Sequence, residues 1–311
     1  MGNSPVLAQG LVVAGHGRHV LVETPTGDRV ICHPRGKKSQ AVVGDRVLWQ
    51  ASTDEGTIEK IVARRNLFYR QDEMRTKSFA ANIDQVLILI AAEPEFSESQ
   101  LTRALISAEA EHIKAVIALN KSDLAEPFAR AWERMLPYQQ MGYTVLPLAL
   151  NPEQEDGTQP PVPDVLTACL AGKTTLVLGP SGVGKSTLVN RLVPSASVLT
   201  REISKALNSG KHTTTHTSWY WVDAAKTTAL IDSPGFQEFG LHHIDAMQLT
   251  AYMPDFKPLV ANCRFYNCSH LHEPGCGVIE SMKLSDSRRG ISANRYKIYS
   301  DLFAELSQSR Y

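Results

Sequence analysis

The chain has 311 residues, of which 43% are hydrophobic and 21% are charged, so it is long enough for two or three folded units, each with its own core. Its 32 basic and 32 acidic residues give zero formal net charge, which provides no global argument for a nucleic-acid partner. No stretch approaches the roughly 20 apolar residues of a membrane helix, and the N-terminus lacks signal-peptide features, so we expect a cytoplasmic protein without a membrane partner.

The first segment, from Gln9 to about Arg65, alternates short β-rich runs with Gly, Pro and charged turns. The expected strands lie at residues 11–13, 19–22, 29–32, 45–48 and 57–58. This pattern predicts an all-β unit over residues 1–66 and suits an OB-fold barrel. Small barrels of this kind bind RNA in some proteins and dock onto proteins in others, and the pattern leaves both open.

The next segment, residues 67–240, alternates strand-like and helix-like runs. Residues 84–90 form a continuous apolar run, which is typical of a strand buried on both faces. A helix-like run at 99–112 and strand-like runs at 115–119, 173–178 and 228–231 follow. We therefore expect a central α/β domain with a parallel sheet, followed by a mainly helical third domain over residues 241–311.

A phosphate-binding loop is expected between the strand at 173–178 and a helix-like segment, because this stretch fits G-x-x-x-x-G-K-S. Its residues are Gly179, Pro180, Ser181, Gly182, Val183, Gly184, Lys185, Ser186 and Thr187. In such loops successive backbone N–H groups face the phosphates, the lysine neutralises the outer phosphates, and the hydroxyl of Ser186 is suited to Mg²⁺. A chance glycine-rich turn is the simpler alternative.

A base-recognition tetrapeptide is expected directly after the strand at 115–119, at Asn120, Lys121, Ser122 and Asp123. The Asp123 carboxylate can accept two hydrogen bonds from N1–H and the exocyclic amine of guanine, a donor pair that adenine lacks. Asn120 would tie the loop together and the stem of Lys121 would cover the base. The tetrapeptide is weak evidence by itself, but beside a phosphate loop it predicts guanine-nucleotide binding and disfavours an ATPase or a small-molecule kinase.

A third element, Asp232-Ser233-Pro234-Gly235, follows the strand at 228–231. Asp232 can hold Mg²⁺ through water while the Gly235 N–H contacts the γ-phosphate, although an exposed turn is the alternative. Polar residues 210–217 could close over the same phosphate, with one threonine as a metal ligand. The tetrapeptide at 120–123 precedes the phosphate loop, the reverse of the Ras-like order, so the sequence predicts a circularly permuted P-loop GTPase domain.

A cysteine and histidine cluster near the C-terminus fits C-x4-C-x-H-x5-C, with Cys263, Cys268, His270 and Cys276 as candidate ligands. Three thiolates and one imidazole form a closed tetrahedral set, so we expect one structural Zn²⁺ rather than a catalytic metal. A disulfide fits poorly with a reduced compartment, unliganded core cysteines would not explain the spacing, and His272 is an alternative ligand.

The C-terminal tail carries basic and aromatic residues that we expect to face RNA phosphates and bases, with a solvated basic helix as the alternative. These residues are Arg288, Arg289, Arg295, Tyr296, Lys297 and Tyr299.

Nearly the whole chain resembles the RsgA family of GTPases, also called YjeQ or EngC, through residues 81–84, 120–123, 179–187, 210–215 and 232–235 and the cysteine pattern. The resemblance implies an N-terminal OB-fold, a permuted GTPase domain and a zinc-binding domain that act on the 30S ribosomal subunit late in its maturation. The implied partners are GTP or GDP with Mg²⁺, the 30S subunit and its 16S rRNA, and we expect a monomer. Thr214 resembles the Mg²⁺-linked threonine of the first switch.

The catalytic set is expected to comprise Lys185, Thr214 and His212. Ras-like enzymes usually place Gln directly after the glycine of D-x-x-G, whereas this chain has Phe236 and only then Gln237. His212 is the candidate substitute for orienting water, a role that resembles proposals for this family; an exposed loop histidine is the alternative. The usual Ser of the guanine-carbonyl loop is also missing, and the N–H of a residue near Ala149 would replace it. The competing function is an RNA-binding checkpoint, in which the nucleotide state controls affinity for the ribosome and hydrolysis is only a slow timer.

Overall fold

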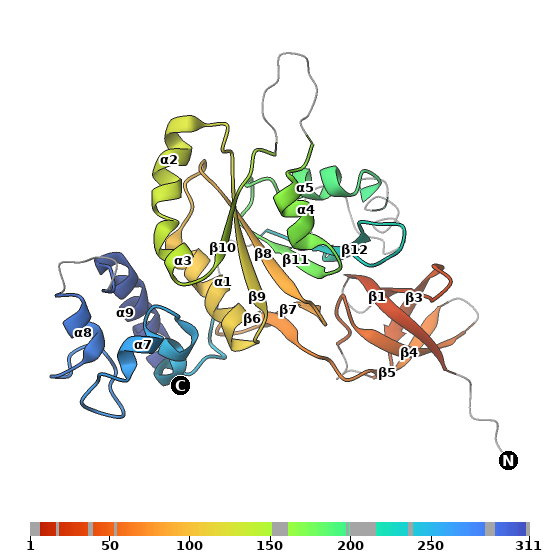
Figure 1. Ribbon diagram of the computed structural model, residues 1–311. Helices are drawn as coiled ribbons and strands as arrows, with labels where there is room; N and C mark the ends of the chain where they lie inside the picture. Colours follow the sequence, from red (N-terminus) through yellow and green to blue (C-terminus); the bar gives the residue numbers. More distant parts are fainter. Residues whose placement is uncertain are drawn as a thin grey trace.

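The computed structural model describes residues 7–16, 19–36, 40–52, 55–150, 161–196, 199, 216–235, 239–283 and 290–308. Three groups of elements lie side by side, with the N-terminal strands on one side of a central sheet and the C-terminal helices on the other (Figure 1). Within these ranges no helix has the length and apolar character needed to cross a membrane.

The N-terminal strands form a small closed barrel. They are β1 (Ala8–His16), β2 (His19–Glu23), β3 (Arg29–Pro34), β4 (Arg46–Ala51) and β5 (Gly56–Ile61). The strand order is β1-β2-β3-β5-β4, and β4 pairs back with β1, so both sheet edges are satisfied. Val12, Val22, Cys32, Trp49 and Ile58 fill its interior. The five predicted strands and the OB-like barrel are therefore confirmed.

The central sheet contains the predicted parallel strands. Its strands are β8 (Gln85–Ala91), β9 (Lys114–Asn120), β10 (Thr144–Pro147), β11 (Thr174–Leu178), β12 (Ser218–Trp221) and β13 (Ala229–Asp232). They run in the order β10-β9-β8-β11-β13-β12, and only β12 is antiparallel to its neighbour. The edge strand β12 also meets β1 at Ser218 and Ala14, so barrel and central strands form one continuous sheet.

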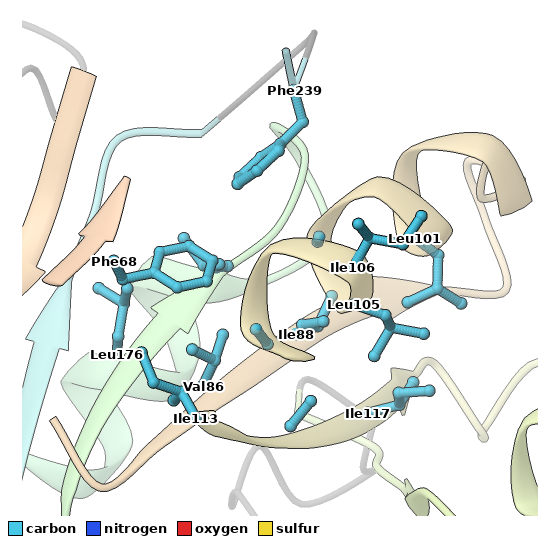
Figure 2. Close-up of a cluster of buried hydrophobic side chains, with 14 of the residues drawn as sticks. Phe68, Val86, Ile88, Leu101, Leu105, Ile106, Ile113, Ile117, Leu176 and Phe239 are labelled. Carbon is cyan, nitrogen blue, oxygen red and sulfur yellow. The ribbon is translucent and has the colours of Figure 1, made fainter. Parts of the chain in front are cut away.

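Helices cover both faces of this sheet. They are α1 (Glu98–Ala110), α2 (Ala125–Glu133), α3 (Leu136–Gln140), α4 (Asp164–Leu170) and α5 (Lys185–Leu192). Successive residues of β8 point to opposite faces, so Val86 and Ile88 share one core with Leu105 of α1, while Leu87 shares the other with Leu188 of α5. Figure 2 shows α1 lying over the strands of the first core. The fully apolar run of β8 is explained by this double coverage.

A separate hairpin, β6 (Leu67–Gln71) and β7 (Thr76–Ala81), packs beneath α1. Phe68 and Phe79 meet there with ring centroids 5.9 Å apart, and both also contact Phe239, a residue that follows the D-x-x-G element. Figure 2 shows the ring of Phe239 directed toward Phe68 and α1. The hairpin thus contacts a segment that is distant from it in the sequence.

The C-terminal elements are η1 (Ala246–Tyr252), α7 (Lys257–Val260), α8 (Gly277–Ser281) and α9 (Ala293–Ser307). Buried Arg295 of α9 joins them to the central unit, because its guanidinium pairs with both oxygens of Asp255 at 2.7 and 2.9 Å and donates to Thr102 Oγ1 of α1 at 2.6 Å. Tyr299 is also buried. The prediction that Arg295 and Tyr299 face RNA is wrong, because both side chains are buried in the packing of α9. Arg288 and Arg289 lie outside the described residues, and Lys297 is exposed, so for these three the prediction is not tested.

Candidate functional site

The predicted phosphate loop connects the carboxyl end of β11 to the N-terminus of α5. At two positions of this loop only glycine fits, because a Cβ atom would collide with a neighbouring strand end. A Cβ at Gly179 would lie 2.1 Å from the Leu89 carbonyl oxygen, and a Cβ at Gly184, whose φ is +106°, would lie 2.6 Å from Asn120 Nδ2. The glycines therefore let the loop lie against the ends of β8 and β9. At the N-cap of α5, Gly184, no side-chain hydrogen bond caps the helix, which suits anion binding at this end.

Lys185 is buried within this loop. Its Nζ donates to the carbonyl oxygens of Gly179 at 2.9 Å and Pro180 at 2.7 Å. Burial lowers the pKa of Lys185, and the nearby Asp232 carboxylate acts in the opposite direction. Since an ammonium group has three donors, one remains for a phosphate oxygen.

Asp232 lies at the end of β13, beside the phosphate loop. It is 6% exposed, and its Oδ1 is buried without a hydrogen-bond partner among the described residues. Burial raises the pKa of Asp232 to about 6, although Lys185 and the Ser233 N–H lower it. A buried carboxylate oxygen without a partner costs free energy, and a hydrated divalent cation would satisfy it. The residues present therefore fit Mg²⁺.

Gly235 lies directly over the loop. A Cβ built on it would be 3.1 Å from Lys185 Nζ and 3.3 Å from the Ser181 nitrogen. Ser186, the other candidate Mg²⁺ ligand, is the second residue of α5 and is exposed. The structure thus brings Lys185, Ser186, Asp232 and Gly235 to one end of the parallel sheet, where ligands of α/β folds bind.

The predicted base-recognition residues lie at the carboxyl end of β9, next to that loop. Asn120 is buried; its Nδ2 donates to the Val183 carbonyl at 2.9 Å, and its Oδ1 accepts from the Leu150 N–H at 3.0 Å. Asn120 therefore ties the phosphate loop to the segment that follows β10. The Asp123 side chain is exposed, as a residue that receives a base should be.

The segment that would replace the usual guanine-carbonyl loop follows β10. Ala149 and Leu150 direct their carbonyl oxygens to Arg191 of α5, at 3.4 and 2.8 Å from its Nη1. The Ser122 N–H donates to the Leu148 carbonyl at 2.9 Å. Arg191 was not singled out from the sequence, where it resembles any helix-surface arginine, and only its position across from Leu150 gives it this role.

Two of the predicted catalytic residues, His212 and Thr214, lie outside the described ranges. The same is true of Phe236 and Gln237, the two residues that follow the glycine of D-x-x-G. Beyond them, the chain is anchored again at Phe239, whose carbonyl accepts from Arg103 Nη1 at 3.3 Å. Gln71 of β6 then exchanges hydrogen bonds with Gly240 and His242. The described exit from the D-x-x-G element therefore contacts the β6–β7 hairpin and α1 before it reaches the C-terminal helices.

The predicted metal ligands converge in the C-terminal unit. The candidate donor atoms of Cys263, Cys268, His270 and Cys276 all lie within 4.8 Å of one another. Cys263 Sγ is 3.9 Å from Cys276 Sγ, and each is 3.4 Å from His270 Nδ1. Tetrahedral bonds of about 2.3 Å would separate two sulfurs by about 3.8 Å, whereas a disulfide needs about 2 Å. The four residues can therefore hold one metal ion, and none forms a disulfide.

The loop that carries His270 is held in place by residues that are not ligands. The Glu273 carboxylate accepts from the N–H and hydroxyl of Ser269 at 2.8 and 2.6 Å, and these and neighbouring N–H groups hold its pKa well below the usual range despite partial burial. Tyr296 and Tyr299 of α9 donate to carbonyls of His270 and Ser269 at 2.9 and 2.8 Å. Sequence reasoning missed Glu273; its position between two ligands was the available signal.

Comparisons with known proteins agree with this architecture. The RsgA GTPase family model matches residues 61–242. A "Small ribosomal subunit biogenesis GTPase RsgA" from Variovorax paradoxus is 69% identical over 98% of this chain and 95% of the relative, and one from Paraburkholderia xenovorans is 50% identical over the same shares.

Two crystal structures also superpose on the chain. YjeQ from Thermotoga maritima aligns with a TM-score of 0.69 and 29% identity over 98% of this chain and all of the other. YloQ, described as a circularly permuted GTPase, aligns with a TM-score of 0.67 and 25% identity over 98% of both. The chain thus belongs to the RsgA GTPase family and is a GTP-hydrolysing enzyme with a circularly permuted GTPase domain.

Proposed function

We propose that this enzyme hydrolyses GTP to GDP and phosphate while it is docked on the small ribosomal subunit, late in the maturation of that subunit, and that docking stimulates turnover. The observation that carries the proposal is the 69% identity, over nearly the whole length of both chains, to a relative named for small ribosomal subunit biogenesis. The enzyme would act in the cytoplasm as a monomer and contact 16S rRNA.

For the guanine base, the proposed contact is Asp123, whose exposed carboxylate accepts from N1–H and the exocyclic amine. Asn120 positions this loop through its bonds to Val183 and Leu150, and Lys121 covers the base with its stem. A backbone N–H near Ala149 faces the guanine carbonyl. Support comes from the shared location of these residues beside the phosphate loop.

For the phosphates, the proposed contacts are the N–H groups of the loop from Gly179 to Thr187 and the ammonium of Lys185. Asp232 would hold Mg²⁺ through water, and Ser186 and Thr214 would be direct ligands. When bound, this ion neutralises charge that develops between the β- and γ-phosphates. The assignment of Asp232 is supported by its buried Oδ1, which has no hydrogen-bond partner in the part of the chain that the structure describes. His212 is proposed to orient the attacking water, on the grounds given by the sequence.

For the Cys₃His cluster, the proposed ion is Zn²⁺ in a structural role. Three thiolates and one imidazole at tetrahedral spacing fill all four positions, so no position is open for a reacting water. The ion would fix the loop from Cys263 to Cys276 against α9.

The test is GTP turnover by the purified protein with and without purified small ribosomal subunits. We expect strong stimulation, and we expect His212→Ala to lower the stimulated rate while leaving GDP affinity nearly intact. Asp123→Asn should shift preference toward xanthosine triphosphate. If subunits bound the protein but left turnover unchanged, the competing function, an RNA-binding checkpoint with a slow timer, would replace this one.

A further inference from the structure

The part of the metal loop between Cys263 and Cys268 places aromatic side chains in solvent. Phe265 is 41% exposed and Tyr266 is fully exposed. Among the large hydrophobic side chains that are exposed in the described ranges, these two are the aromatic ones, and they are consecutive. Neither packs into the core, so folding does not account for them.

The surroundings of this pair are polar and positively charged. Arg264 is exposed, and its guanidinium carbon lies 5.6 Å from the centre of the Phe265 ring. Asn267 and His272, in the same loop, are also exposed. The charged side chains between Cys263 and Cys276 are Arg264 and Glu273, and Glu273 is directed inward to Ser269 and its neighbours. The outer face of the loop therefore presents a cation without a competing carboxylate.

The loop is also held in one geometry. Cys263 and Cys268 flank the aromatic pair as candidate metal ligands, and the Arg264 N–H donates to the Gly275 carbonyl at 3.0 Å. A Cβ at Gly275, whose φ is +74°, would lie 3.2 Å from Arg264 Cβ, so the two parts of the loop are in direct contact. A surface that is ordered before binding loses little conformational entropy when a ligand arrives.

We infer that Arg264, Phe265 and Tyr266 form a stacking platform for unpaired RNA bases of the small ribosomal subunit, an inference that rests on the proposed function. Aromatic rings stack on bases of any sequence, and an arginine beside them pairs with phosphate or stacks on a further base. Tyr, Phe and Arg are also enriched in protein interfaces. RNA is favoured over a protein partner because the loop places a cation beside the rings and turns its one carboxylate inward, which matches a phosphate backbone. This platform takes the RNA-contacting role that the sequence assigned to Arg295 and Tyr299, which are buried.

The first experiment measures affinity of the full chain for purified small ribosomal subunits in the presence of a non-hydrolysable GTP analogue. We expect the double variant Phe265→Ala/Tyr266→Ala to bind about tenfold more weakly or worse. Val165→Ala, an exposed apolar side chain on α4, is the matched control and should bind normally. Unchanged zinc content and unchanged turnover without subunits would show that the double variant is folded. If the double variant does not fold, Tyr266→Ala alone provides the same test, because this position is fully exposed.

The second experiment distinguishes stacking from general apolar contact. Tyr266→Trp should retain affinity, whereas Tyr266→Leu should lose it as Tyr266→Ala does. Ultraviolet cross-linking followed by mass spectrometry should find a nucleotide adduct on the peptide that contains residues 264–267. If Tyr266→Leu bound normally, or if this peptide cross-linked to a ribosomal protein instead, the platform would be a protein contact and the inference would be overturned.

The outcomes also separate this inference from the proposed function. If the unmodified chain failed to bind small ribosomal subunits, the proposed function would fail, and the inference with it. If the unmodified chain bound and the alanine variants bound equally well, only the stacking platform would be rejected.

Discussion

The nucleotide site and the Cys₃His centre differ in how their polar groups are satisfied before any ligand is present. At the nucleotide site the Asp232 Oδ1 has no partner among the described residues, Asp123 is exposed, and Lys185 donates to carbonyls of its own loop. At the Cys₃His centre the four donors already lie within 4.8 Å of one another, and neighbouring side chains hold their loop. The first arrangement suits a ligand that comes and goes, and the second suits a resident ion.

Removal of a metal ligand should have the largest effect. Cys276→Ser should abolish zinc binding and unfold the C-terminal unit, because structural zinc contributes about 10–16 kcal/mol in small domains. Metal analysis and circular dichroism would measure this. Cys169→Ser, in α4 outside the cluster, is the control and should keep both metal and fold. A folded C-terminal unit in metal-free Cys276→Ser protein would show that packing on α9 suffices.

Asn120→Ala should have the next largest effect. It leaves the Val183 carbonyl and the Leu150 N–H without partners, at about 1–3 kcal/mol for each buried group. We expect the dissociation constant for GDP to rise roughly 10- to 100-fold. Asn190→Ala, on the exposed side of α5, should leave it unchanged. Equal GDP affinity in the two variants would mean that Asn120 does not position the base loop.

Asp232→Asn should have opposite effects on stability and on nucleotide binding. The folded-state pKa of Asp232, about 6, lies above its ordinary value, so its contribution to the free energy of unfolding declines as pH rises from about 4 to 6. At pH 7 the buried carboxylate therefore costs roughly 2–3 kcal/mol. Denaturant unfolding without nucleotide should show Asp232→Asn to be more stable at pH 7, while its Mg²⁺-dependent GTP binding weakens.

The control for this measurement is Asp301→Asn, at an exposed position of α9. For the unmodified protein, Mg²⁺-dependent GTP binding should also weaken as pH falls below about 6, where Asp232 gains its proton. If Asp232→Asn did not raise the free energy of unfolding at pH 7, burial of the ionised Asp232 carboxylate would not destabilise the folded protein.

Removal of the ion pair that links α1 to α9 should have the smallest effect on stability. Arg103 of α1 forms a bidentate ion pair with Glu305 of α9 and donates to the Phe239 carbonyl. Because both side chains are partly exposed, we expect a coupling free energy of about 1 kcal/mol in a double-mutant cycle of Arg103→Met and Glu305→Gln. Additive effects on unfolding would show that α9 is held to α1 by Arg295 and apolar packing instead.

The local motifs were predictable because each depends on residues close in sequence. The barrel strands, the apolar run of β8 and the C-x4-C-x-H-x5-C spacing are of this kind. The orientation of α9 was not predictable from its composition. A basic, aromatic helix can face solvent or core, and Asp255 and Thr102, distant in sequence, decide that Arg295 is buried.

The phosphate loop, the base tetrapeptide, the candidate ligands and the rotated order of motifs could all be predicted, because spacing along the chain encodes them. What those motifs contact depends on how the chain folds in space. The tertiary fold joined Asn120 to the phosphate loop, led the chain after Gly235 to the β6–β7 hairpin, and left Phe265 and Tyr266 rather than Tyr299 in solvent. Burial and long-range hydrogen bonding set these outcomes, and neither is a property of a short stretch of sequence.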